Sequence, residues 1–164
     1  MRTRAARRED AAAIAVIYNE GIEDRLATFE TEPRSAADVL GWLDAFPVVV
    51  AEDGDGDVAA WASAPPYSSR PAYGTVREFS IYVARSARGR GFGRATLVAL
   101  IAECEGRGWS KLVSRVFPEN EASLALCRSL GFREVGVYRR HARLDGRWRD
   151  CVIVERLLGE AARA

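Results

Sequence analysis

The sequence predicts an α+β fold in which most neighbouring strands run antiparallel. The expected elements follow the order β-α-α-β-β-β-α-β-α-β-β, so strands follow one another directly at two places along the chain. Aspartate–glycine pairs within residues 53–56 and at 145–146 separate strand-like segments, and such pairs favour the tight turns of hairpins. We therefore expect a central sheet of six or seven strands flanked by about four helices.

Four segments have helical signals, at residues 8–19, 36–45, 93–106 and 121–130. In the first, Ile14, Ile17 and Tyr18 recur at the spacing of one helix face. Ser35 is a suitable N-cap for the second. Gly131 is a suitable C-cap for the fourth. The strands are expected between these helices, at residues 2–5, 48–51, 58–64, 75–84, 111–117, 132–144 and 148–157.

Size and charge limit the function. The 164 residues contain 48% apolar side chains and show no linker or repeat, so we expect one domain over residues 1–164. Basic and acidic residues nearly cancel, 24 against 23, which argues against a nucleic-acid partner. Lys111 is the only lysine, so nearly all the positive charge is carried by arginine.

The chain is poor in metal-ligating patterns. Cys104, Cys127 and Cys151 are widely spaced and form no C-x-x-C pair, and His141 is the only histidine. No metal site is expected, and the cysteines suit a reducing cytoplasm better than a disulfide framework. No segment approaches the roughly 18 apolar residues of a membrane helix, so no membrane partner is expected.

The most informative segment is an arginine-glycine loop, V-A-R-S-A-R-G-R-G-F-G-R-A at residues 83–95. A strand enters a glycine-rich turn that opens a helix, and this arrangement lets backbone amides and the helix dipole bind phosphates. Residues 85–94 contain four arginines and no acidic residue, a local charge of +4 in a chain whose total is +1. The loop predicts a pyrophosphate site.

Two common phosphate-binding motifs do not fit this loop. A Walker A loop needs a lysine, and none is present. The G-x-G-x-x-G fingerprint fails in both registers, because Arg94 or Thr96 stands where its third glycine should be. The pattern R-G-x-G-[FILV]-G followed by a small residue two positions on is complete, and it resembles the acetyl-CoA loop of the GCN5-related N-acetyltransferases (GNAT). The resemblance implies the GNAT fold and acetyl-CoA as co-substrate, bound by Arg88, Gly89, Arg90, Gly91, Phe92, Gly93, Arg94 and Ala95.

Features further along the chain strengthen the resemblance. Asn120 and Ser123 open the fourth helix and L-G-F at 130–132 closes it, in the family's order behind the loop. The resemblance implies that Asn120 contacts the cofactor and that Ser123 caps the helix or contacts the cofactor. It covers almost the whole chain and is closest to the phosphinothricin and methionine sulfoximine acetyltransferases, through motifs such as A-T-F-E at 27–30, R-P-A-Y at 70–73 and G-R-W-R-D at 146–150.

The resemblance assigns chemistry to the strand at 75–84. Glu78 matches the group's catalytic glutamate, which would remove a proton from the incoming ammonium, directly or through water. Strand alternation places Glu78, Ser80 and Tyr82 on one face. Tyr82 would shape the site or return a proton to the leaving thiolate. The backbone amide of Val83 would hydrogen-bond the thioester oxygen.

The acceptor implied by the resemblance is the α-amine of a small amino-acid-like anion. Arg70 is the candidate carboxylate clamp, because a guanidinium binds a carboxylate with two hydrogen bonds. Phe29 and Glu30 lie on the loop that borders the acceptor site in this family. Cys127 replaces the group's usual histidine, and the segment 140–146 departs from the group's pattern, so the identity of the acceptor stays open.

Other functions remain open from the sequence. The family also acetylates peptide N-termini and other metabolite amines, and a non-catalytic acyl-CoA-binding domain would carry the same loop. The resemblance also implies a homodimer, although no interface can be recognised in the sequence.

Overall fold

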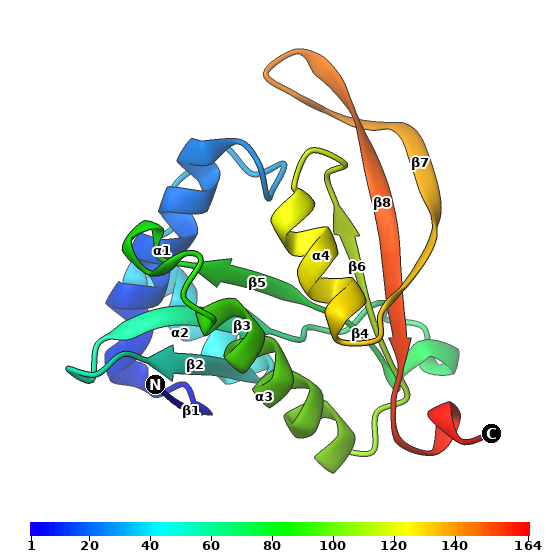
Figure 1. Cartoon of the computed structure of the whole chain (residues 1–164), viewed down its shortest axis with the longest axis horizontal. Helices are drawn as coiled ribbons and strands as arrows, with labels where there is room; N and C mark the ends of the chain where they lie inside the picture. Colours follow the sequence, from blue (N-terminus) through cyan, green and yellow to red (C-terminus); the bar gives the residue numbers. More distant parts are fainter.

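The computed structural model describes every residue from Met1 to Ala164 and contains the four expected helices and the expected strands, one of which is divided in two (Figure 1). The helices are α1 (Ala11–Asp24), α2 (Ala36–Ala45), α3 (Phe92–Gly106) and α4 (Glu121–Ser129). The strands are β1 (Arg2–Ala5), β2 (Val48–Glu52), β3 (Val58–Ser63), β4 (Val76–Glu78), β5 (Ser80–Val83), β6 (Lys111–Val116), β7 (Arg133–Leu144) and β8 (Arg147–Leu157).

The strands form two four-stranded sheets instead of one central sheet of six or seven strands. The first has the order β1-β2-β3-β5 and is antiparallel throughout. The second has the order β4-β6-β8-β7, in which only β4 and β6 run parallel. The expected α+β class with mostly antiparallel pairing is therefore confirmed, and the strand count is corrected to eight.

The correction comes from the segment expected to be one long strand over residues 75–84. It is interrupted at Phe79, so β4 joins one sheet and β5 joins the other. The amide of Phe79 still donates to the carbonyl of Val113 on β6, while the amide of Glu78 donates to Pro65. Beyond Phe79 the segment leaves β6 and pairs with β3. The two sheets consequently diverge from this point, and α4 lies alongside the gap between β5 and β6 (Figure 1).

Helices cover both faces of the first sheet. The apolar faces of α1 and α2 pack on β2 and β3 around Ile14, Val39 and Trp61. On the opposite face α3 joins α4 and the second sheet in the largest core cluster, around Leu97, Leu100 and Leu112. The N-terminal end of α3 is thereby held beside β5.

Local chemistry explains the element ends. Ser35 Oγ accepts from the amide of Asp38, so the predicted N-cap of α2 is confirmed. The turn between β7 and β8 has positive φ at both Asp145 and Gly146, as a two-residue hairpin turn requires. Helix α1 runs five residues past the expected end at Asn19, because no Gly-Pro breaker follows and it stops only at left-handed Arg25.

Candidate active site

A cavity of about 450 Å³ lies beside the arginine-glycine loop, and we call it the loop cavity. It opens between β5, the start of α3 and the start of α4, where the two sheets diverge. Eight of the residues expected to bind a cofactor line it: Val83, Arg88, Gly89, Gly91, Gly93, Arg94, Asn120 and Ser123.

Backbone conformation and close packing explain why glycines stand in this loop. Gly89 and Gly91 have φ of +73° and +87°, in the left-handed region that side chains disfavour. Gly91 precedes α3, whose first-turn amides have no acceptor within the helix and can bind an anion. At Gly93 a Cβ would lie 3.3 Å from Val83 Cγ2, so a side chain there would narrow the space between α3 and β5.

The remaining loop residues lie outside the cavity. Phe92 is 4% exposed and packs among alanines of the first sheet, which anchors the start of α3. Arg90 lies over the ring of Phe92 with its guanidinium carbon 5.4 Å from the ring centre. Ala95 is half-buried, and its amide donates to the carbonyl of Gly91.

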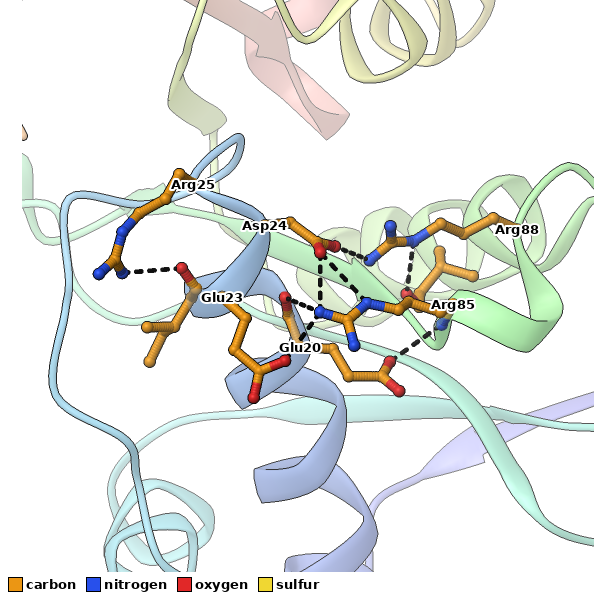
Figure 2. A network of polar contacts seen from close by, with 8 residues as sticks. Glu20, Glu23, Asp24, Arg25, Arg85 and Arg88 are labelled. Carbon is orange, nitrogen blue, oxygen red and sulfur yellow. Dashed lines mark hydrogen bonds and ion pairs between the residues drawn. The ribbon is translucent and has the colours of Figure 1, made fainter.

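Two of the four arginines behind the local charge of +4, Arg85 and Arg88, form ion pairs with acidic residues at the end of α1 (Figure 2). Arg85 does not line the cavity and forms ion pairs with Glu23 and Asp24, each 2.8 Å long. Arg88 lines the cavity and forms an ion pair with Asp24 at 2.7 Å. Arg94 also lines it and donates to Ser129 Oγ at 2.9 Å.

β5 has a free edge toward the gap. It is the last strand of its sheet, and the amide of Ala84 donates to Ala59 on β3. Because hydrogen bonding alternates residue by residue in an antiparallel pair, the N–H and C=O of Val83 face away from β3. The carbonyl of Val83 accordingly accepts from Arg88 Nε at 3.3 Å. The amide of Val83 is thus free for a ligand in the gap.

A second cavity of about 340 Å³, the central cavity, adjoins the first. Tyr82, Asn120 and Ser123 line both. The central cavity brings together the remaining catalytic and acceptor candidates with one exception: Glu78, Tyr82, Phe29, Glu30 and Cys127 all line it. Asn120 caps α4 with its side-chain oxygen, which accepts from the amide of Ser123 at 3.2 Å.

Tyr82 is held by other aromatic side chains. Its ring stacks on Trp61 and meets Tyr18 edge-on, with ring centres 5.0 Å away in both cases. Burial of its phenol raises the pKa of Tyr82 above the ordinary value. The group therefore stays protonated at physiological pH and is a poor acid.

Cys127 belongs to both the core and the cavity. It is 2% exposed and packs in the largest core cluster, yet it also lines the central cavity. Burial raises the pKa of its thiol to about 11, so it is a neutral thiol at physiological pH.

Glu78 has a cationic partner that sequence reasoning missed. Its Oε1 accepts from Arg115 Nη2 at 2.7 Å and from Arg115 Nε at 3.2 Å. Arg115 lies on β6, beside the end of β4. Its hydrogen bonds to Glu78 raise the pKa of the Arg115 guanidinium. An alternating strand pattern gives no signal for this pairing, since it depends on the parallel contact of β4 with β6.

Arg70 lies in a third cavity of about 620 Å³, which we call the rim cavity. The structure therefore does not bring Arg70 into the central cavity with Cys127. The two cavities nevertheless share Glu78, Ser114 and Arg115 in their walls. Tyr67, Tyr73 and His141 also line the rim cavity.

Two general features complete the description of the site. No group of three or more histidine, cysteine, aspartate or glutamate side chains is placed to hold a metal ion. None of the helices combines the length and apolar character that crossing a bilayer requires.

Comparison with known proteins identifies the family. Residues 14–132 match the model of the acetyltransferase (GNAT) family. A phosphinothricin N-acetyltransferase from Alcaligenes faecalis is 38% identical, over 94% of this chain and 81% of the relative. An L-methionine sulfoximine/L-methionine sulfone acetyltransferase from Pseudomonas paraeruginosa is 31% identical, over 89% of this chain and 88% of the relative.

A solved structure agrees with these relatives. It is a GNAT-superfamily phosphinothricin acetyltransferase from Sinorhizobium meliloti in complex with acetyl-CoA, with a TM-score of 0.92 and 33% identity over 99% of this chain and 91% of the other. The expected resemblance to the phosphinothricin and methionine sulfoximine group is confirmed, and so is the GNAT fold. The chain belongs to the acetyltransferase (GNAT) family and is an N-acetyltransferase.

Proposed function

We propose that this enzyme acetylates the α-amine of a small amino-acid-like acceptor, of the phosphinothricin or methionine sulfoximine type, by direct attack on acetyl-CoA. The observation that carries the proposal is the Glu78–Arg115 pair where the central and rim cavities meet. An α-amino acid carries an ammonium and a carboxylate on the same carbon. Such a zwitterion can exchange with the pair, its ammonium against Glu78 and its carboxylate against Arg115.

We assign the loop cavity to acetyl-CoA, which when bound supplies an acetyl group activated as a thioester. Arg88, Arg94 and the first-turn amides of α3 offer cationic and N–H groups for the pyrophosphate. Asn120 and Ser123 lie where the loop cavity joins the central cavity, on the path from the phosphate site to Glu78. The free amide of Val83 is the candidate donor to the thioester oxygen.

Glu78 is the candidate general base. Its carboxylate accepts the proton that the acceptor's ammonium must lose before its nitrogen lone pair can attack the thioester carbon. Oε1 is held by Arg115, and no hydrogen bond engages Oε2, which is the oxygen left for the acceptor. We assign Tyr82 the role of shaping the site, because its raised pKa makes proton donation to a leaving thiolate unfavourable.

Three groups delimit the acceptor. Phe29 packs edge-on against Phe117, with ring centres 4.9 Å apart, and closes one side of the central cavity. Glu30 is oriented by an ion pair with Arg34 at 2.9 Å. Arg70 remains a candidate anion clamp, reached from Glu78 through the rim cavity, where it suits an acidic group at the far end of the acceptor.

An acceptor panel tests the proposal. Thiol release from acetyl-CoA is measured with methionine sulfoximine, with an amine of the same length that lacks the α-carboxylate, and with peptides carrying free N-termini. We expect turnover of the amino acid at least about tenfold above the amine, and we expect Arg115→Met to remove most of that preference. Activity on peptides alone would favour an N-terminal acetyltransferase. Tight acetyl-CoA binding with no turnover would favour a non-catalytic domain.

We further propose a homodimer in a reducing cytoplasm. Exposed apolar side chains gather on the β7–β8 hairpin, namely Val135, Val137, Tyr138 and Trp148, each about half exposed. The three cysteines are free thiols. Light scattering at assay concentrations is expected to give twice the mass of 18.0 kDa, and a monomer would contradict the dimer.

A further inference from the structure

The acidic end of α1 lies against the arginine-glycine loop, where Asp24 contacts Arg85 and Arg88 (Figure 2). Asp24, the last residue of α1, lines the loop cavity, where the other charged lining residues are Arg88 and Arg94. Asp24 is therefore the one negative charge in the wall of a cavity expected to receive a polyphosphate. Its sign is opposite to what an anion-binding surface requires.

Asp24 is bound to both arginines that approach it. Arg85 donates to Oδ1 from Nε at 3.1 Å and from Nη2 at 2.8 Å. Arg88 Nη2 lies 2.7 Å from Oδ2 of Asp24. This oxygen is shielded from solvent, and its contact with Arg88 is an ion pair that lacks the alignment of a hydrogen bond. The two arginines lower the pKa of Asp24, so it is ionised at physiological pH.

The two arginines play different parts in this cluster. Arg85 is further fixed by Glu23 and by the backbone of Glu20, and its guanidinium does not line the cavity. Arg88 has Asp24 and the carbonyl of Val83 as its partners, and it lines the cavity. When a ligand displaces Asp24 from Arg88, the carboxylate of Asp24 stays paired with Arg85. The displacement therefore leaves no buried charge without a partner.

We propose that Asp24 is an internal competitor for Arg88 that weakens the binding of CoA and speeds its release. In the free enzyme the carboxylate of Asp24 forms an ion pair with the guanidinium of Arg88. A bound pyrophosphate replaces Asp24 as the ionic partner of Arg88. The pyrophosphate then lies near the negative charge of Asp24, and the repulsion between the two weakens its binding. When CoA leaves, Asp24 again becomes the partner of Arg88. The inference rests on the proposed assignment of the loop cavity to acetyl-CoA.

Titration calorimetry with CoA tests the proposal, using the wild-type chain and Asp24→Asn. The amide keeps the shape of the side chain and removes its charge. We expect Asp24→Asn to bind CoA about tenfold more tightly, and product inhibition by CoA to strengthen by a similar factor. Glu23→Gln is the matched control, because Glu23 pairs with Arg85 in the same network but does not line the loop cavity. Its affinity for CoA should change less than about twofold.

A second measurement separates charge competition from a general change of the site. Acetyl-pantetheine carries the thioester without the pyrophosphate, so its turnover should be equal in the wild-type chain and in Asp24→Asn. If Asp24→Asn unfolds, Asp24→Ser replaces it in both measurements. Equal or weaker CoA binding by the variant would overturn the inference, as would an equal gain with acetyl-pantetheine. A wild-type chain that binds no CoA would instead overturn the proposed function.

Discussion

Gly21 on α1 and Tyr82 on β5 are in such close contact that a side chain at position 21 would overlap the tyrosine ring. A Cβ at this position would lie 2.8 Å from both Cδ1 and Cε1 of the Tyr82 ring. The ring cannot move aside freely, because Trp61 stacks on it and Tyr18 meets it edge-on. The absence of a side chain at Gly21 therefore sets the position of Tyr82 between the loop and central cavities.

This contact predicts the effect of Gly21→Ala. Overpacking against an enclosed ring should destabilise the fold by about 1–3 kcal/mol, partly offset by the helix propensity of alanine, and should lower kcat/KM by displacing Tyr82. Gly41→Ala in α2 is the control, because a Cβ there meets nothing within 4 Å. It should raise stability by up to about 1 kcal/mol and leave activity unchanged. Chemical denaturation and steady-state kinetics of both variants give the answer, and equal behaviour would contradict the packing argument.

Glu78→Gln removes the proposed base while keeping the side chain's shape. We expect kcat/KM to fall by a factor of about 10²–10⁴, with the Kd of acetyl-CoA nearly unchanged, because Glu78 does not line the loop cavity. Glu134→Gln is the control, since Glu134 also pairs with an arginine, Arg128, but on the outer surface. A Glu78→Gln enzyme with wild-type rates would show that another group takes the proton.

The thiol of Cys127 should not become acetylated. Its pKa of about 11 leaves almost no thiolate at neutral pH, and the thiolate is the nucleophilic form. Intact-mass measurement of the enzyme with acetyl-CoA and no acceptor should show an unmodified chain. A stable acetyl thioester mapped to Cys127 would contradict direct attack by the acceptor amine.

Asp10 should make the fold sensitive to acid. The residue is 8% exposed, and its carboxylate accepts from Arg4 at 2.7 and 2.9 Å and from the amide of Arg7. These contacts, that of Arg4 above all, lower its pKa from 3.8, so its stabilising contribution is present above that value and is lost as the pH falls through the lower folded pKa. Asp10→Asn should lower the free energy of unfolding by about 3 kcal/mol at pH 7 and by progressively less below about pH 4.

Asp44→Asn is the matched control for Asp10→Asn. Asp44 pairs with Arg8 at 2.9 Å, but both side chains are more than 60% exposed. Loss of this exposed ion pair should lower the free energy of unfolding by less than about 1 kcal/mol. Urea unfolding from pH 3 to pH 7 compares the two, and a pH-independent difference between wild type and Asp10→Asn would disprove the linkage.

Much of the fold could be predicted because its signals are local. The cap at Ser35, the Asp145–Gly146 turn and the spacing of Ile14, Ile17 and Tyr18 each depend on neighbours in the chain. The break at Phe79 could not be predicted, since an unbroken run of strand-forming residues carries no sign that its halves pair with different partners. The Arg115 partner of Glu78 was missed for the same reason.

The sequence by itself determined the family, the element order and the residues of the arginine-glycine loop, because these depend on residue type and spacing along the chain. Tertiary structure decided the electrostatics of the site. It brings Glu20, Glu23 and Asp24 of α1 against Arg85 and Arg88, which lie more than 60 residues later, and so cancels much of the loop's local charge. It also moves Arg70 to a separate cavity and places Arg115 beside Glu78. Charges act through space, so their net effect on a site is fixed only when the chain has folded.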